Sequence, residues 1–293
     1  MQIVLLGTTA MVPTKDRNHV GTFLSYGSDG LLFDCGEGIQ RQMKTAGIRL
    51  TKITKVFISH WHGDHVLGLP GLLQSLAFEE YSKTLQIYGP RGTKERISLL
   101  ERAFETYKKI GMKIIELDDT EYDFRKYTVM ARRLDHGTIC YGFSFIEKDR
   151  RKIRLNVVDK LGIPHGPLLA KLQNGKTITF RKSKVTPDEA TSIIRGKKVT
   201  YISDTRPCKN AVELASDSDI LISEATYIDR DKERAIEYRH MTSGEAAMIA
   251  QSADVKKLVL THFSQRYKDT TELLDDARRV FPETVLGHDL MKL

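Results

Sequence analysis

The chain has 293 residues, 40% of them hydrophobic and 29% charged, which suits one α/β domain or two small globular ones. No apolar stretch approaches the roughly 20 residues that cross a bilayer, and the N-terminus lacks the basic start and long apolar run of a signal peptide, so we expect no membrane span. The three cysteines, Cys35, Cys140 and Cys208, are far apart and odd in number, which is typical of a reducing compartment and indicates a cytoplasmic protein.

Short β-branched runs alternate with amphipathic stretches along the chain, a pattern that predicts an α/β fold. In chain order, the first half is expected to contain strands at 3–6, 22–26 and 31–33, a helix at 38–45, a strand at 55–59, a helix at 68–78, a strand at 85–88, a helix at 93–107, and strands at 113–117, 128–132 and 141–146. The second half is expected to contain a helix at 188–194, a strand at 198–202, a helix at 208–216, a strand at 220–223, a helix at 243–253, a strand at 258–260, a helix at 271–281 and a strand at 285–286. The helix at 188–194 is predicted from its opening, because Thr186 is a good capping residue and Pro187 suits the first helical position.

The net charge of +8 is concentrated in one segment, residues 147–184. This segment contains eleven lysines or arginines and three acidic residues, while the rest of the chain has equal numbers of each sign. Its middle, around Gly162, Gly166 and Pro167, is rich in glycine and proline, so it is either a disordered loop or a projecting arm. The concentrated positive charge favours an acidic partner such as nucleic acid.

Four potential metal ligands follow the strand at 55–59 within six residues: His60, His62, Asp64 and His65. In an extended loop His60 and His62 project the same way and can bind one ion. Asp64 and His65 follow at the turn into the next helix, where they can bind a second ion close by. Imidazole and carboxylate ligands suit zinc, and manganese or iron also fit them.

One segment cannot complete two metal sites, so other strand ends must supply ligands. The remaining histidines are His19, His136, His165, His240, His262 and His288. Of these, His136 and His262 come just past predicted strands, where functional sites in open sheets and sandwiches collect. Asp204 also ends a strand, and its two carboxylate oxygens make it the best candidate to bridge two ions.

The segment His60-Trp-His-Gly-Asp-His65 resembles the HxHxDH signature of the metallo-β-lactamase superfamily. The resemblance narrows to the tRNase Z family of endonucleases, which mature tRNA 3′ ends, and it covers nearly the whole chain. Residues 13–18 are similar to that family's PxKxRN loop. Further matching segments are Leu6-Gly-Thr8, Phe33-Asp-Cys-Gly-Glu-Gly38, Tyr88-Gly-Pro-Arg-Gly92, Ser203-Asp-Thr-Arg-Pro207, Glu224-Ala-Thr-Tyr227, His240-Met-Thr242 and Thr261-His-Phe-Ser-Gln-Arg-Tyr267. Ser223 departs from the pattern, because the family often has histidine there.

This resemblance implies an αββα sandwich, with one domain over residues 1–293 and an inserted flexible arm at 147–184. It implies two zinc ions per subunit, one held by His60, His62 and His136, the other by Asp64, His65 and His262, with Asp204 bridging them. Asp64 is also expected to orient the attacking water or accept its proton, and His240 is a candidate proton donor.

The resemblance also implies a substrate, precursor tRNA, and a homodimer in which the arm of one subunit clasps the tRNA bound to its partner. The arm residues Gly162, Gly166 and Pro167 belong to this expectation. Lys15, Arg17, Ser264 and Arg266 are candidate RNA contacts, although the three basic residues are equally compatible with ordinary surface charges. We expect no nucleotide cofactor.

Other functions are compatible with the same metal motif. Hydrolases of small phosphodiesters, thioesters and lactones use it, but they have little need for a localised basic arm. An mRNA-processing nuclease of the β-CASP type needs a large inserted domain, for which 293 residues leave no room. An inactive RNA-binding module is a further alternative, and the complete set of ligands argues against it.

Overall fold

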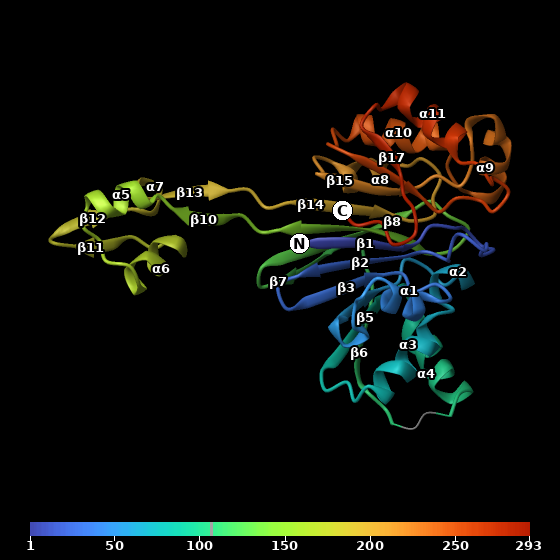
Figure 1. Cartoon of the computed structure of the whole chain (residues 1–293), viewed down its shortest axis with the longest axis horizontal. Helices are drawn as coiled ribbons and strands as arrows, with labels where there is room; N and C mark the ends of the chain where they lie inside the picture. Colours follow the sequence, from blue (N-terminus) through green and yellow to red (C-terminus); the bar gives the residue numbers. More distant parts are fainter. Residues whose placement is uncertain (106–107) are drawn as a thin grey trace.

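Two β-sheets packed face to face form the centre of the computed structural model, and helices cover the outer face of each sheet (Figure 1). The structure describes residues 1–105 and 108–293. This four-layer arrangement confirms the expected αββα sandwich. Within the described ranges, no helix has the length and apolar character needed to cross a membrane.

The first sheet contains six strands that follow one another in sequence order. They are β1 (Gln2–Gly7), β2 (Gly21–Tyr26), β3 (Asp29–Phe33), β4 (Lys55–Phe57), β5 (Thr84–Gly89) and β6 (Gly111–Glu116). The first three strands are antiparallel, and β3 to β6 are parallel. The turn between β2 and β3 needs the left-handed conformation of Gly27, whose φ is 58°.

The second sheet contains seven strands in the order β17-β16-β15-β14-β9-β8-β7. Their bounds are β7 (Glu121–Phe124), β8 (Tyr127–Leu134), β9 (Cys140–Glu147), β14 (Lys198–Ile202), β15 (Ile220–Glu224), β16 (Leu258–Thr261) and β17 (Thr284–Leu286). Strands β14 to β17 are parallel, so their carboxyl ends lie at one edge of the sheet. Every strand predicted from the sequence is present.

The hydrophobic core lies in three layers. Between the sheets, Phe57 stacks on Tyr88 with ring centroids 4.6 Å apart and meets Phe143 of the opposite sheet at 5.5 Å. Outside the first sheet, buried side chains pack under α1 (Ile39–Thr45), α3 (Leu69–Phe78) and α4 (Thr93–Ala103). Outside the second sheet, they pack under α8 (Lys209–Ala215), α10 (Ser243–Ser252) and α11 (Thr271–Val280).

Two predicted helices differ from the structure. The helix predicted at 93–107 ends at Ala103, and its last predicted residue lies outside the described ranges. The helix predicted at 188–194 is a single turn, α7 (Pro187–Ala190), followed by the strand β13 (Thr191–Ile194). The capping box at Thr186 does start a helix, but the β-branched residues after it pair with another strand, so tertiary pairing overrides the local signal.

Residues from Arg150 to Ile194 project from one end of the sandwich (Figure 1). The strands β10 (Arg150–Ile153) and β13 pair antiparallel as a stalk. Beyond the stalk lie α5 (Leu155–Lys160), α6 (Pro167–Gln173), β11 (Ile178–Phe180), β12 (Ser183–Val185) and α7. These elements enclose their own small core, formed by Val158, Ile163, Leu169, Leu172, Ile178, Val185 and Ala190. The segment 147–184 therefore has secondary structure and a core, unlike a disordered loop, and its fold continues to Ile194.

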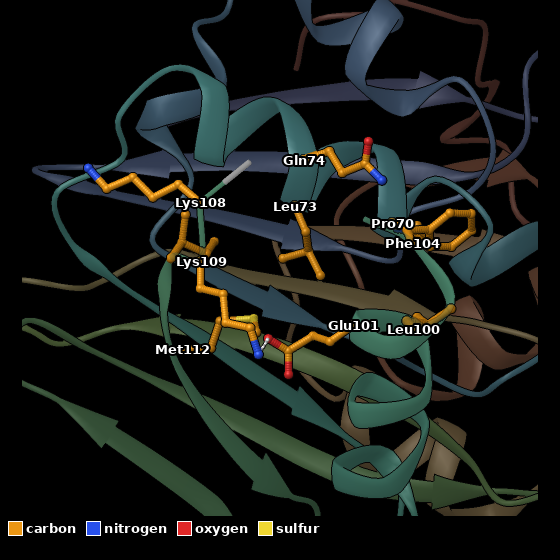
Figure 2. Close-up of a pocket in the computed structure, with 10 residues that line it drawn as sticks. Pro70, Leu73, Gln74, Leu100, Glu101, Phe104, Lys108, Lys109 and Met112 are labelled. Atoms are coloured by element: carbon orange, nitrogen blue, oxygen red, sulfur yellow. Dashed lines mark ion pairs between the residues drawn. The ribbon is translucent and has the colours of Figure 1, made fainter. Parts of the chain in front are cut away.

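An apolar cavity of about 30 Å³ lies between α3, α4 and β6 (Figure 2). Leu73, Leu100 and Met112 line it, and Lys109 and Glu101 form an ion pair of 3.9 Å beside it. The described residues that line the cavity are mainly apolar, which indicates imperfect packing of the outer layer rather than a site for chemistry.

Candidate metal centre

The ends of several strands bring polar side chains together at one edge of the two sheets. His60 follows β4, His136 follows β8, and Asp204 and His262 follow the parallel strands β14 and β16. His62, Asp64 and His65 come from the loop after β4 and from the short helix α2 (Gly63–Val66). The structure thus brings together all seven side chains predicted as metal ligands.

One group contains His60, His62, His136 and Asp204, whose candidate ligand atoms all lie within 4.8 Å of one another. The Nε2 atoms of His60 and His136 lie 3.5 and 3.9 Å from Oδ2 of Asp204. His136 Nε2 also lies 3.4 Å from His62 Nδ1.

A second group contains Asp64, His65 and His262. The Nε2 atoms of His65 and His262 lie 3.5 and 3.4 Å from Oδ2 of Asp64. They lie 3.4 and 3.2 Å from Oδ1 of Asp204. The two carboxylate oxygens of Asp204 therefore face different groups, which is the arrangement of a bridging ligand.

Four buried polar atoms in this cluster have no hydrogen-bond partner among the described residues: His60 Nε2, Asp64 Oδ1, His65 Nε2 and Asp204 Oδ1. Leaving buried polar atoms unpaired is costly, and such atoms ordinarily receive a partner. Imidazole nitrogens and carboxylate oxygens that converge in this way suit a divalent metal ion. The residues present therefore fit a metal centre.

The charges of the clustered side chains also fit a metal centre. Burial opposes ionisation of Asp204, but the charges of His262 and His65 outweigh it and hold the pKa of that carboxyl well below its usual range. Burial lowers the pKa of His60, which favours the neutral ring that binds metals. Burial also opposes charge on His65, yet Asp204, Asp34 and Asp64 surround the ring and raise its pKa. A cation bound there would take the place of that proton.

Asp34 supports the ligands from behind. It follows β3 in the left-handed conformation, with φ of 58°. Its Oδ2 accepts hydrogen bonds from Ser59 Oγ at 2.8 Å and Tyr201 OH at 2.9 Å, and lies 2.8 Å from His65 Nδ1. Because the carboxylate accepts, His65 donates from Nδ1 and keeps Nε2 directed at the cluster.

Two other ligands are oriented in the same way. Nδ1 of His136 lies 2.9 Å from the carbonyl oxygen of Arg239, so it donates and leaves Nε2 for a metal. Nδ1 of His262 lies 2.8 Å from Thr226 Oγ1, and Thr226 donates in turn to Glu224 Oε2 at 2.6 Å. These contacts fix the direction of each ring before any ion binds.

His240 lies beside the metal cluster and is paired with Glu224. Its Nδ1 is 3.0 Å from Glu224 Oε1 and 4.0 Å from Asp204 Oδ2. Burial opposes a charge on the ring, but the Glu224 carboxylate raises the pKa of His240 to about 9. The ring is thus held with its proton at neutral pH. Ser223, the departure from the family pattern, is buried and donates to the carbonyl oxygen of Glu224 at 3.0 Å.

The candidate RNA contacts lie in two places. Lys15 and Arg17 line a hollow of about 580 Å³ beside the loop after β16, and Arg17 donates to the carbonyl oxygen of Tyr267 at 2.6 Å. Arg266 donates to Ser264 Oγ at 3.1 Å and lies over the Tyr227 ring. Gly162, Gly166 and Pro167 belong to the projecting arm, at the other end of the long axis from α2 and the metal cluster (Figure 1).

Comparisons with known proteins agree with this geometry. A family model described as anti-Pycsar protein Apyc1 matches residues 1–152, and one described as a beta-lactamase superfamily domain matches residues 170–263. Ribonuclease Z of Archaeoglobus fulgidus is 41% identical over 299 aligned positions, which cover 100% of this chain and 97% of the relative. The chain belongs to the ribonuclease Z family. A second ribonuclease Z, of Methanothermobacter thermautotrophicus, is 39% identical over 99% of this chain and 95% of its own length.

Solved structures of related proteins have the same fold as this chain. Human tRNase Z, short form, superposes with a TM-score of 0.74 at 28% identity, covering 100% of this chain and 98% of the human one. The metallo-β-lactamase fold protein YhfI of Bacillus subtilis has a TM-score of 0.72 at 22% identity, which shows the fold alone. The chain is therefore an endoribonuclease with a metallo-β-lactamase fold and a centre for divalent metal.

Several residues that support the candidate metal centre could not be assigned a role from the sequence. Asp34 and Thr226 contact the candidate ligands His65 and His262. Tyr201 donates to Asp34, and Glu224 contacts Thr226 and His240, so these two support the ligands indirectly. Asp34 and Glu224 do carry a signal, since each is an acidic residue at the end of a buried apolar strand. Tyr201 and Thr226 carry no such signal, because they read as ordinary core and loop residues.

Proposed function

We propose that this enzyme removes the 3′ trailer from tRNA precursors by hydrolysing one phosphodiester bond, with two zinc ions per subunit. The observation that carries the proposal is the convergence of two ligand groups on the two oxygens of Asp204, in a chain that ribonucleases Z match over its whole length. Within this proposal, His60, His62 and His136 hold one ion, Asp64, His65 and His262 hold the other, and Asp204 bridges them.

When bound by these residues, two such cations would supply Lewis acidity that lowers the pKa of a nearby water toward roughly 7 and offsets charge on the phosphoryl oxygens. Asp64 has an unpartnered buried oxygen, Oδ1, which is free to orient the attacking water and to accept its proton. The water oxygen forms a bond to phosphorus while the bond from phosphorus to the ribose 3′-oxygen breaks. The trailer then leaves with a 5′-phosphate.

His240 supplies the proton that the departing ribose 3′-oxygen needs. Glu224 holds Nδ1, which leaves Nε2 as the nitrogen that faces substrate, and the raised pKa keeps the ring protonated at neutral pH. Proton transfer from this ring leaves a 3′-hydroxyl on the tRNA. Zinc fits the site because all of its candidate ligands are imidazoles and carboxylates, which zinc binds in catalytic sites.

The RNA is held by basic groups outside the metal centre. Lys15, Arg17, Ser264 and Arg266 flank the site and supply donors to the acceptor stem or the scissile phosphate. The projecting arm, with most of the excess positive charge, binds tRNA phosphates without reading bases. Because the arm points away from the metal centre of its own chain, it serves the site of a partner subunit in a homodimer (Figure 1). We also propose a cytoplasmic location, which the three free thiols support because they suit a reducing compartment.

The first test is a cleavage assay with zinc-loaded protein and a tRNA precursor that carries a 3′ trailer. We expect one metal-dependent cut just after the discriminator base, leaving a 3′-hydroxyl, and no cut by Asp64→Ala. If the precursor stays intact while a small phosphodiester or a thioester is hydrolysed, the enzyme is a two-metal hydrolase with another substrate. If neither is hydrolysed and RNA still binds, the chain is an RNA-binding module.

A further inference from the structure

His19 is a buried histidine outside the candidate metal ligands, and its side chain contacts the loop formed by residues 8–18. The residue is 3% exposed. Its Nε2 lies 3.0 Å from the carbonyl oxygen of Met11. Because a carbonyl oxygen only accepts, the ring donates from Nε2. Its Nδ1 is buried without a partner.

Met11 in turn contacts the metal cluster through its backbone. Its N–H donates to Oδ2 of Asp64 at 2.8 Å. The same oxygen lies 3.5 and 3.4 Å from the Nε2 atoms of His65 and His262. Met11 has a φ of 37°, a left-handed conformation that residues with a side chain rarely adopt without support. The two hydrogen bonds, one at its N–H and one at its carbonyl, supply that support.

The surroundings of His19 give its ring a fixed position. Thr9 and His19 form a parallel β-bridge, and the amides of Thr8 and Thr9 donate to the carbonyl oxygen of Asn18. A side chain at Gly36 would meet the Cβ atom of His19 at 2.5 Å and the backbone oxygen of Asp64 at 2.3 Å. The Cβ atom of His19 is therefore packed against the same glycine as the backbone of Asp64.

The geometry points to His19 as a positioning residue for the Asp64 carboxylate, acting through the carbonyl and the N–H of Met11. Its ring fixes the turn at Met11, and the N–H of that turn holds Oδ2 of Asp64 in the direction of His65 and His262. The inference rests on the proposed role of Asp64 as a metal ligand. Outer partners that orient a ligand typically change metal affinity by about 10–100-fold when they are removed.

The test uses two substitutions of similar length that differ in their ability to donate. His19→Met introduces a side chain of similar length without a donor, whereas the amide of His19→Gln can donate to the Met11 carbonyl. Zinc binding to the metal-free proteins is measured by calorimetry for the wild type, both variants and Asp64→Ala. Thermal melting of the metal-free proteins checks folding, and His19→Leu replaces His19→Met if the latter does not fold.

We expect the wild type to bind two zinc ions and Asp64→Ala to lose one. His19→Met should weaken the same binding step by about 10–100-fold, and His19→Gln should restore it to within about threefold of the wild type. If His19→Met binds both ions as the wild type does, or if His19→Gln is as weak as His19→Met, the positioning role is overturned while the metal centre stands. If Asp64→Ala binds as much zinc as the wild type, both the ligand assignment and the inference drawn from it fall.

Discussion

At the scale of single residues, His240 has two conceivable roles in the metal centre. One of its ring nitrogens is close enough to Asp204 and His262 for the three residues to form a ligand group. However, Nδ1 is 3.0 Å from Glu224 Oε1 and 4.0 Å from Asp204 Oδ2, so the carboxylate of Glu224 is the nearer partner of that nitrogen. A ring committed to Glu224 at Nδ1 suits a proton donor better than a metal ligand.

His240→Ala separates the two roles. We expect turnover of a tRNA precursor to fall by about 10²–10⁴-fold, the usual contribution of a positioned general acid, with bound zinc unchanged at two ions per subunit. Turnover is measured under single-turnover conditions, and zinc by atomic emission on the dialysed protein. The control is Met248→Ala, which changes an exposed side chain of α10 that is outside the described candidate ligand groups. Loss of an ion from His240→Ala would make His240 a ligand and remove it as the donor.

Most of the metal cluster could be predicted from the sequence, because four of its side chains belong to one segment. His60, His62, Asp64 and His65 are so close in sequence that local geometry brings them together. Asp204 required a further premise, that strand ends meet at one edge, and the structure bears this out. The contacts of Asp34 and of Met11 could not be predicted, since they depend on how distant loops pack.

At the scale of elements, the arm is joined to the sandwich by the stalk of β10 and β13. At the base of that stalk the two chain segments lie side by side, because the amide of Glu147 donates to the carbonyl oxygen of Lys197 at 2.9 Å. Ile146 and Lys198 then pair as neighbouring residues of β9 and β14. Removing the arm at this point leaves two ends that a tight turn can connect.

Replacing residues 149–195 by an Asn-Gly turn should leave the sandwich folded, since the arm has a separate core. We expect binding of a tRNA precursor to weaken by at least about tenfold at 0.1 M salt and to depend less steeply on salt, because fewer phosphate contacts remain. Hydrolysis of a small phosphodiester should stay within about twofold of the wild type. Filter binding over a series of salt concentrations measures the first effect, and a colorimetric assay measures the second.

The control for this deletion keeps the arm and changes only its charge. Lys171 and Lys176 are exposed, so replacing both by glutamine should preserve the fold of the arm and flatten the salt dependence by a smaller amount. If the deletion abolished hydrolysis of the small phosphodiester, the arm would be part of the catalytic domain.

Most elements of the sandwich were predictable from the sequence, whereas most of those of the arm were not. The strand β7 and the helix α9 (Lys232–Tyr238) of the sandwich were not predicted, and both have mostly exposed or half-buried residues. Most strands of the sandwich are buried apolar runs, such as 258–260 in β16, and the outer helices direct apolar residues at the sheets. The arm elements are short, and α5 buries only Val158. Short elements with one buried residue show no periodic pattern of apolar residues. The basic and Gly/Pro-rich composition of residues 147–184 was therefore what indicated a distinct segment.

At the scale of the whole molecule, the arm and the metal centre lie at opposite ends of the long axis (Figure 1). An arm that extends away from its own site cannot hold the part of the RNA next to the bond that this site cuts. A two-fold dimer resolves this conflict, because each arm can then bind the tRNA whose trailer the partner removes.

Mixing two variants that are each defective in precursor cleavage tests this arrangement. One carries the Asn-Gly turn in place of residues 149–195 and keeps its metal centre, and the other carries Asp64→Ala and keeps its arm. If arms act across a dimer, unfolding and refolding the mixture should restore cleavage of the precursor to about a quarter of wild-type activity or less, above either variant alone. Sedimentation equilibrium of the wild type supplies the control for the dimer. A mixture no more active than its components would show that each arm serves its own subunit.

The separate core of the arm also has a consequence for the evolution of the sequence. A substitution at Leu169 or Leu172 loosens packing only within the arm, since their contacts lie in its own core. The stalk is the only covalent route by which that loss could reach the ligands. Under the proposed role of the arm, substitutions in it can change which RNAs bind without changing the candidate metal ligands. Sequence variation should therefore accumulate faster beyond the stalk than at the strand ends.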